Sequence, residues 1–244
     1  MKHKIKNFKF TLNKKIPVDK FLEKAMYQPK FGYYNNRVPF GKDGDFVTAP
    51  TISNLFSEIL AIWIISAWEK LEQPKIFNLV ELGPGDGSLA KILIQTFKKF
   101  PKFNKSVNIY LYEKSNLLKK IQKKKIENKK IKWIKNYNSI KKGPVFFFGN
   151  EFFDAIPIKQ FTLNNKKFLE KCYVINKKGL VTTYKEPLLD DISFIKSFDM
   201  FRNQNFIEYP KLGLLELNKI IKKISALSGG ILLIDYGYLK PFNG

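Results

Sequence analysis

The chain has 244 residues, 44% of them hydrophobic, which is enough to bury one substantial core with an appended subdomain. It has 44 lysine and arginine residues against 21 aspartates and glutamates, a formal net charge of +23. Only Arg37 and Arg202 are arginines and the lysines are scattered, so the excess fits a coding bias as well as a nucleic-acid surface, where arginine is favoured, and we do not expect nucleic-acid binding.

The near absence of histidine and cysteine restricts the chemistry. Histidine occurs only at His3 and cysteine only at Cys172, which excludes an internal disulfide and argues against triad catalysis and histidine-rich metal sites. Residues 1–20 lack the apolar stretch of about 7–15 residues that a signal peptide needs. The most apolar run, residues 59–68, is far shorter than the roughly 20 residues that span a bilayer. We expect a cytoplasmic protein with no transmembrane segment and no metal.

The N-terminal region, residues 1–75, is predicted to be helical, with a loop that can act as a lid. Helices are expected over 17–28 and 51–72, the second capped by Thr48. The second helix carries an apolar stripe that we interpret as core packing: Ile52, Leu55, Phe56, Ile59, Leu60, Trp63 and Leu71. Residues 31–46 are dense in glycine and aromatics, which indicates a loop packed against the rest of the protein.

Residues 78–89 (NLVELGPGDGSL) predict a strand, a tight glycine-rich turn and the start of a helix. The three alternating glycines tolerate positive φ, so backbone N–H groups and the helix N-terminus can approach a nucleotide-like ligand. Ser88 stands where a dinucleotide fingerprint needs its last glycine, which disfavours NAD. Glu81, at the end of the strand, suits a positively charged ligand such as a sulfonium or ammonium better than a pyrophosphate. An ordinary strand–helix connection is the alternative.

A second acidic residue ends the next predicted strand. That strand spans residues 107–112 and is followed by Glu113, 26 residues after Gly87. Nucleoside-binding α/β units carry an acidic residue about 20 residues after the glycines, and a loop over 101–106 is expected to account for the excess. A carboxylate there would accept hydrogen bonds from both ribose hydroxyls. A solvated charge at a strand end is the alternative.

Alternating helices and strands continue to residue 149. The predicted elements are helices over 88–99 and 115–125, the second capped by Ser115, and strands over 131–135 and 144–149. This alternation predicts a doubly wound α/β sheet with right-handed crossovers. Ligands of such sheets bind beyond the C-terminal strand ends, so Glu81, Glu113 and the segment after Gly149 are expected around one crevice.

Residues 150–157 (NEFFDAIP) supply polar groups at this edge of the sheet. Asn150, Glu151 and Asp154 place one amide and two carboxylates among phenylalanines, a composition that is unusual for a plain loop. Helix capping by Asn150 and Asp154 is the structural alternative.

Beyond residue 157 the hydrophobic period changes to that of β-strands. Turn signals at 164–165 and 177–179 predict an antiparallel insertion over 158–206 that interrupts the parallel sheet, and no structure is assigned to 186–206. A helix over 212–227, stopped by two glycines, leads to a fifth core strand and its terminal loop over 231–238. That strand would expose an apolar edge.

Five segments occur in the order found in a known family. The chain resembles the MidA-like S-adenosylmethionine-dependent methyltransferases, which include a mitochondrial complex I assembly factor that methylates an arginine of a core subunit. The matching segments are Phe31–Tyr34, Gly44–Pro50, Glu81–Gly85, Asn150–Pro157 and Ile234–Gly237. Together they are specific, whereas the glycine-rich turn alone would not be.

The resemblance implies a class I, Rossmann-like methyltransferase fold with S-adenosyl-L-methionine as cofactor. A sheet of that class continues past its fifth strand, so the resemblance also implies that this sheet is C-terminally truncated. The residues that it implies around the cofactor are Glu81, Gly83, Pro84, Gly85, Glu113 and Asn150. The family often has a basic residue where this chain has Asp86, so no role is assigned to that position. The implied substrate is a protein, specifically a core subunit of respiratory complex I.

An arginine acceptor would need carboxylates that hold its planar guanidinium by bidentate hydrogen bonds and direct one nitrogen toward the methyl group. We expect Glu151 and Asp154 to be these catalytic residues. Four further residues are expected to close over the substrate as a lid: Tyr33, Asp45, Phe46 and Thr48.

These expectations divide the chain into four regions. They are an N-terminal helical and lid region (1–75), a cofactor-binding core (76–157), a β insertion (158–206), and a return helix with the fifth core strand (207–244). Three alternatives stay open: an RNA or small-molecule methyltransferase, a non-catalytic complex I assembly chaperone and, weakest, an NAD-linked oxidoreductase. The oligomeric state is not defined by the sequence.

Overall fold

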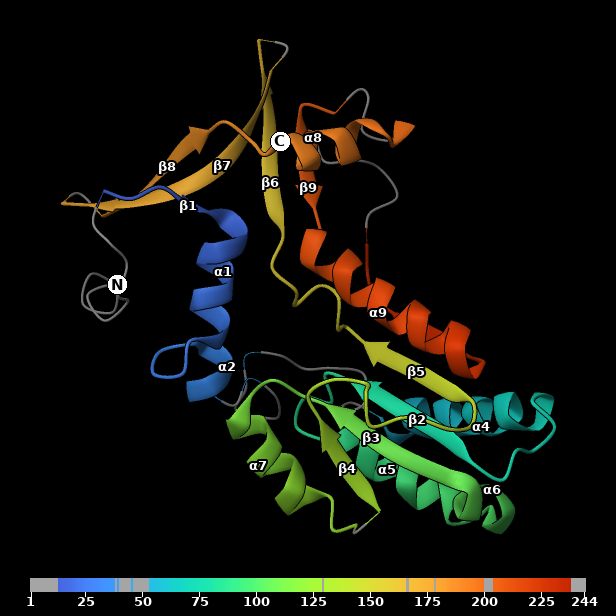
Figure 1. The fold of residues 1–244 in the computed structure, drawn as a ribbon. Helices are drawn as coiled ribbons and strands as arrows, with labels where there is room; N and C mark the ends of the chain where they lie inside the picture. Colours follow the sequence, from blue (N-terminus) through green and yellow to red (C-terminus); the bar gives the residue numbers. More distant parts are fainter. Residues whose placement is uncertain are drawn as a thin grey trace. The chain divides into compact units, whose positions relative to one another are not determined.

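The computed structural model divides the chain into two compact units (Figure 1). The antiparallel unit contains the described residues up to Gly32, those from Asp154 to Glu216, and those from Tyr236 onward. The parallel unit contains Tyr33–Phe153 and Leu217–Asp235. The residues that the structure describes are 13–37, 39, 45, 53–128, 130–165, 167–177, 179–199 and 204–237.

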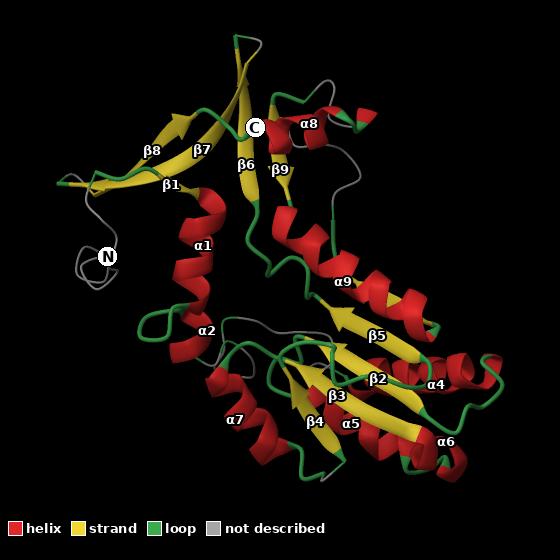
Figure 2. Ribbon diagram, viewed as in Figure 1, coloured by secondary structure: helices red, strands yellow, loops and turns green. Residues whose placement is uncertain are grey.

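The parallel unit is built on a five-stranded sheet with the order β10-β5-β2-β3-β4, and every adjacent pair is parallel. Figure 2 labels four of these strands, β5, β2, β3 and β4, side by side. Its strands are β2 (Phe77–Leu82), β3 (Val107–Tyr112), β4 (Ile131–Ile134), β5 (Val145–Asn150) and β10 (Gly229–Ile234). Leu82 pairs with Tyr112 on one side and Gly149 on the other, so the carboxyl ends of the three central strands lie together. This topology confirms the predicted α/β class.

Helices cover both faces of this sheet because side chains alternate between faces along each strand. Leu79 belongs to the core cluster that α4 (Asn54–Lys70) and α5 (Ser88–Phe97) cover. Val80 belongs to the opposite cluster, which contains Ile220 of α9 (Lys211–Leu227). Every residue of β2 is buried. The remaining helices of this unit are α2 (Tyr33–Asn36), α6 (Pro101–Ser106) and α7 (Asn116–Lys125).

One local prediction in the parallel unit is wrong, and another falls outside the described residues. Residues 101–106 form helix α6 rather than a loop, because Pro101 fits the first helical turn, where its missing N–H costs nothing. Helix α4 is capped by Ser53, whose hydroxyl accepts a hydrogen bond from the Leu55 N–H at 3.2 Å. The expected cap, Thr48, lies outside the described residues.

The prediction that the apolar stripe of α4 is core is also wrong in part. Leu60 is buried, but Leu55, Ile59 and Trp63 are 61%, 60% and 42% exposed. The helix is apolar on nearly all sides, and a sheet covers only one side of a helix. Among the described residues, the outer side of α4 is therefore an exposed apolar surface.

The antiparallel unit has its own five-stranded sheet, with the order β1-β7-β6-β9 and β8 paired to β7. Its strands are β1 (Ile16–Pro17), β6 (Lys159–Asn164), β7 (Lys167–Asn176), β8 (Gly179–Lys185) and β9 (Phe206–Tyr209), and its helices are α1 (Val18–Tyr27) and α8 (Leu189–Lys196). The predicted antiparallel strands are present, but they do not interrupt the parallel sheet. They pair instead with β1, which lies outside the predicted insertion, and with β9, which extends past its end.

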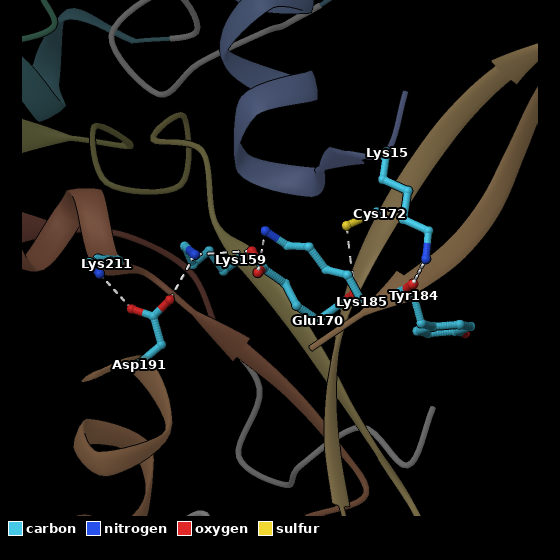
Figure 3. A network of polar contacts seen from close by, with 8 residues as sticks. All are labelled: Lys15, Lys159, Glu170, Cys172, Tyr184, Lys185, Asp191 and Lys211. Carbon is cyan, nitrogen blue, oxygen red and sulfur yellow. Dashed lines mark hydrogen bonds and ion pairs between the residues drawn. The ribbon is translucent and has the colours of Figure 1, made fainter. Parts of the chain in front are cut away.

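A buried network of charges links the elements of this unit (Figure 3). The Lys159 ammonium donates to Glu170 at 3.0 Å and to Asp191 at 2.7 Å, and both carboxylates are fully buried. Lys211 donates to the second oxygen of Asp191 at 2.5 Å. The Lys185 ammonium lies 3.0 Å from the second oxygen of Glu170, an ion pair without hydrogen-bond geometry. Burial alone would lower the pKa of Lys159, but its two carboxylate partners raise it.

No helix in the described part of the chain is both long and apolar enough to span a bilayer.

Candidate functional site at the carboxyl end of the parallel sheet

The glycine-rich turn after β2 has a backbone that requires glycine. Gly83, Gly85 and Gly87 have φ values of +62°, +55° and +83°, in the left-handed region. A Cβ added to Gly83 would lie 2.9 Å from the ring of Phe152, so this glycine is needed for space as well as for conformation. The Gly83 N–H donates to the Tyr112 carbonyl at 3.0 Å, which fixes the start of the turn against β3.

Glu81, the penultimate residue of β2, is a buried carboxylate. Its side chain is 3% exposed, and its Oε2 has no hydrogen-bond partner among the residues described. Burial, reinforced by the nearby carboxylates of Asp86 and Glu113, raises the pKa of Glu81 to about 8. A buried acceptor without a donor is costly in a protein interior. This arrangement suits a ligand that brings a donor or a positive charge.

Glu113 lies just beyond the end of β3 and is also buried. Its Oε1 accepts a hydrogen bond from the Ser115 N–H at 2.7 Å, and its Oε2 accepts one from the Gln122 side-chain amide at 3.1 Å. Burial raises the pKa of Glu113, and these hydrogen bonds oppose the rise. A carboxylate has about four lone-pair sites, so Glu113 can still accept a further donor such as a hydroxyl.

Ser115 connects this carboxylate to the segment expected to act as a lid. Its hydroxyl caps α7 by accepting from the Leu118 N–H at 3.1 Å, as predicted, and donates to the Tyr34 carbonyl at 2.6 Å. The neighbouring Tyr33 donates its hydroxyl to Asp45, and burial together with this hydrogen bond raises the pKa of Tyr33 to about 12. Tyr33 and Asp45 therefore meet, and their role as a lid stays a prediction. Phe46 and Thr48 lie outside the described residues.

The segment after β5 approaches the glycine-rich turn through an aromatic ring. Asn150 ends β5, and the Glu151 N–H donates to the Ile234 carbonyl of β10 at 2.8 Å. Glu151 has φ +52°, an uncommon conformation for a residue with a side chain, and such backbone strain is concentrated at functional sites. Phe152 follows and packs against Gly83. The parallel unit thus gathers Asn150 and Glu151 at the same strand ends as Glu81 and Glu113.

Asp154 is the first residue of this segment in the antiparallel unit, because the boundary between the units follows Phe153. The pairing of Asp154 with Glu151 as catalytic residues stays a prediction that rests on their closeness in the sequence.

Two groups of α7 contact the glycine-rich turn and were not predicted. Lys125 forms an ion pair with Asp86, and Gln122 donates to the Gly85 carbonyl at 2.8 Å. Burial alone would raise the pKa of Asp86, but hydrogen bonds from Lys125 and Ser88 lower it. In the sequence, Gln122 and Lys125 lie in a lysine-rich helix in which no position stands out.

The fold and the site together define an α/β protein with a glycine-rich turn of the kind that binds nucleosides and acidic residues at the ends of the first two strands of its parallel sheet. Residues 59–243 match the family described as "Putative S-adenosyl-L-methionine-dependent methyltransferase". The chain belongs to this family, in agreement with the resemblance found in its sequence motifs.

Curated relatives carry more specific names. The chain is 28% identical to the protein arginine methyltransferase NDUFAF7, mitochondrial, of Xenopus laevis, covering 95% of this chain and 59% of that protein. It is 26% identical to the human protein of that name, covering 91% of this chain and 56% of that protein. A Drosophila melanogaster homolog is 32% identical over 64% of this chain and 40% of its own length. The chain therefore spans about half the length of these relatives.

A solved structure confirms the fold. A Burkholderia thailandensis protein crystallised with S-adenosyl-homocysteine superposes with a TM-score of 0.75 at 21% sequence identity, covering 92% of this chain and 59% of that one.

The expected cytoplasmic location is contradicted, because the names of the curated relatives place them in mitochondria. The expectation rested on a single cysteine and on the lack of a secretory signal in residues 1–20. Neither feature distinguishes the cytoplasm from another compartment that keeps thiols reduced.

Proposed function

We propose that this protein is an S-adenosyl-L-methionine-dependent methyltransferase that modifies an arginine side chain of another protein. The observation that carries the proposal is Glu81, a buried carboxylate with an unpartnered oxygen at the mouth of a glycine-rich turn. Membership of the methyltransferase family and the names of the curated relatives support it.

The residues present fit the cofactor. The left-handed glycines of the turn let backbone N–H groups approach a nucleoside without a side chain in the way. Glu113 can accept a further hydrogen bond, as from a ribose hydroxyl, and Glu81 is an acceptor in need of a cationic or donating group. Pro84 and Asn150 complete the set that we propose around the cofactor. When bound, S-adenosyl-L-methionine supplies a methyl group activated by its sulfonium charge.

We assign the acceptor side of the reaction to Glu151 and Asp154. Carboxylates hold a guanidinium by bidentate, charge-assisted hydrogen bonds, which fix its plane and present one nitrogen for methylation. A nitrogen that gains a methyl group must lose a proton, and a carboxylate in contact with it can take that proton. The strained backbone at Glu151 supports the assignment, because such strain persists where function requires a particular side-chain direction.

The acceptor protein that we propose is a core subunit of respiratory complex I. Support for this choice comes from the sequence resemblance, whereas the names of the relatives support arginine as the target and a mitochondrial location.

Binding is tested first, by calorimetric titration of S-adenosyl-L-methionine and S-adenosyl-homocysteine into the purified chain, with NAD as the control ligand. We expect micromolar binding of the two methionine derivatives and none of NAD. The opposite preference would refute the proposed cofactor.

Transfer is then followed with a radiolabelled methyl group offered to mitochondrial protein and to RNA. We expect label in protein, at arginine, and a loss of at least about a hundredfold in Glu151→Gln with cofactor binding retained. The control variant is Glu69→Gln, which removes an exposed carboxylate on α4. Label in RNA would identify a different substrate class, and full protein methylation by Glu151→Gln would remove that residue from the mechanism.

A further inference from the structure

Gln122 is a fully buried amide at the centre of the polar contacts around the proposed cofactor site. Its side-chain nitrogen donates to the Gly85 carbonyl at 2.8 Å and to the Glu113 carboxylate at 3.1 Å. Its side-chain oxygen accepts from the indole N–H of Trp133 at 2.9 Å. One side chain of α7 therefore contacts the glycine-rich turn, the carboxylate after β3 and a side chain of β4.

The chemistry of the three partners fixes the orientation of this amide. A backbone carbonyl and a carboxylate only accept hydrogen bonds, and an indole N–H only donates. If the amide were flipped, its oxygen would face the two acceptors and its NH₂ group would face the donor, and all three hydrogen bonds would be lost. Trp133 thus determines which end of Gln122 faces Gly85 and Glu113.

We propose that Gln122 is a positioning residue for the cofactor site, with Trp133 fixing its amide. This inference rests on the proposed function, since Gly85 and Glu113 act on a ligand only if the site binds one. Gln122 sets the distance between the carbonyl of the turn and the strand-end carboxylate, two groups on different loops. It also fixes the second oxygen of Glu113 at 3.1 Å, while the Ser115 N–H holds the first at 2.7 Å, so the two donors together set the plane of the carboxylate.

A second contact shows that α7 is tied to the turn at more than one point. Lys125, three residues along the same helix, pairs with Asp86 and donates to Ser88 at 2.9 Å. These charged groups are partly exposed, so solvent screens them. Gln122 is buried and uncharged, and its hydrogen bonds are directional at any salt concentration. It is therefore the contact that defines the geometry.

The test compares variants of the full chain by calorimetric titration with S-adenosyl-homocysteine. Gln122→Met keeps the length of the side chain and removes all three hydrogen bonds, and Trp133→Phe removes only the orienting donor. We expect affinity about 10- to 100-fold weaker in Gln122→Met, since it loses a hydrogen bond to a charged group and leaves buried acceptors unpaired. Trp133→Phe, which keeps both amide donors, is expected to lose about three- to tenfold.

Asn78→Leu is the matched control for a change in stability alone. Asn78 is also a buried amide, but it lies at the opposite end of β2, where it donates to the Lys142 and Pro144 carbonyls at 2.8 and 3.2 Å. Its loss should lower the melting temperature about as much as Gln122→Met and leave the affinity of the folded protein within about twofold.

A second readout is specific to positioning. The affinity ratio between S-adenosyl-homocysteine and its analogue without ribose hydroxyls reports how well Glu113 is aligned for those hydroxyls. We expect a large ratio in the wild type and in Asn78→Leu, and a clearly smaller ratio in Gln122→Met, where Glu113 keeps only its backbone hydrogen bonds. Wild-type binding with the same affinity and ratio in Gln122→Met would overturn this inference alone. A wild-type chain that binds neither compound would overturn the proposed function, and this inference with it.

Discussion

Replacement of Glu81 by glutamine tests whether the cofactor site stores a proton that the ligand displaces. Burial and two acidic neighbours raise the pKa of Glu81 from an ordinary 4.5 to about 8. At pH 7 only about 10% of the ligand-free folded protein would carry this charge, and ionising the rest costs about 1.4 kcal/mol. A sulfonium bound nearby favours the ionised form. Binding of S-adenosyl-L-methionine at pH 7 should therefore release up to about 0.9 proton from this residue.

Because binding releases a proton, a higher pH favours binding, whereas the stability of the ligand-free protein should fall as the pH rises. A carboxyl group with a raised folded pKa contributes stability that is fully present below its unfolded pKa, and that stability is lost as the pH rises through the folded pKa. For Glu81 this loss extends from about pH 4.5 to about pH 8 and reaches roughly 3 kcal/mol at pH 7. Glu81→Gln removes the titration, so the variant should be more stable than the wild type at pH 7 while binding the cofactor more weakly.

The assay is calorimetric titration of S-adenosyl-L-methionine at pH 7 in two buffers with different ionisation enthalpies. The difference in observed heat counts the protons released, and it should be larger in the wild type than in Glu81→Gln. Protons from the ligand itself cancel in this comparison. Titration with S-adenosyl-homocysteine, which has no sulfonium charge, should reduce the difference. Equal proton release by the wild type and the variant would refute the reasoning.

Two further substitutions, one in each unit, test the packing of the glycine-rich turn and the buried charge network. Gly83→Ala combines a left-handed φ with a Cβ contact of 2.9 Å to Phe152, and it should abolish binding of S-adenosyl-homocysteine. It should also lower the free energy of unfolding by more than the roughly 1–3 kcal/mol that backbone strain alone would cost. Gly179→Ala, with φ +114° and no atom within 4 Å of the added Cβ, is its control in thermal unfolding, and an equal loss in both would exclude the steric contribution. Asp191→Asn removes the buried carboxylate that pairs with Lys159 and Lys211. It should lower the free energy of unfolding, measured by chemical denaturation, by about 3–5 kcal/mol. Burial would raise the pKa of Asp191 but its lysine partners lower it, so the difference between wild type and variant should shrink as the pH falls through this lowered pKa, and a constant difference would contradict the ion pairing.

The parallel sheet could be predicted because its signals are local. Its strands are short apolar runs, the turn after β2 has three glycines, and the hydroxyl of Ser115 caps α7 as its position indicated. The antiparallel sheet could be predicted only in part, since β1 pairs with β7 across more than 150 residues and two residues of strand leave no periodic pattern. The exposed side of α4 was mistaken for core because hydrophobicity shows that a surface is apolar and not what covers it.

The side chains around the proposed cofactor site also include some that the sequence predicts and one that it does not. The acidic residues at the strand ends could be predicted from their place after apolar runs, because the carboxyl ends of parallel strands meet at one edge. Gln122 could not, since its importance comes from three partners that are remote in sequence and that only the fold assembles.

The distribution of ion pairs gives an independent reason to assign function to Glu81. The chain has a formal net charge of +23, and among the described residues lysines pair with Asp86, Glu170 and Asp191. The charged groups that shift the pKa of Glu81 are both acidic, and its Oε2 has no hydrogen-bond donor in the described part of the chain. In a lysine-rich protein, a single nearby lysine would relieve this cost. A buried carboxyl group without a cationic partner is what a site adapted to a cationic ligand requires, because the ligand supplies the missing charge and their attraction in a medium of low dielectric constant offsets the cost of ionising the group.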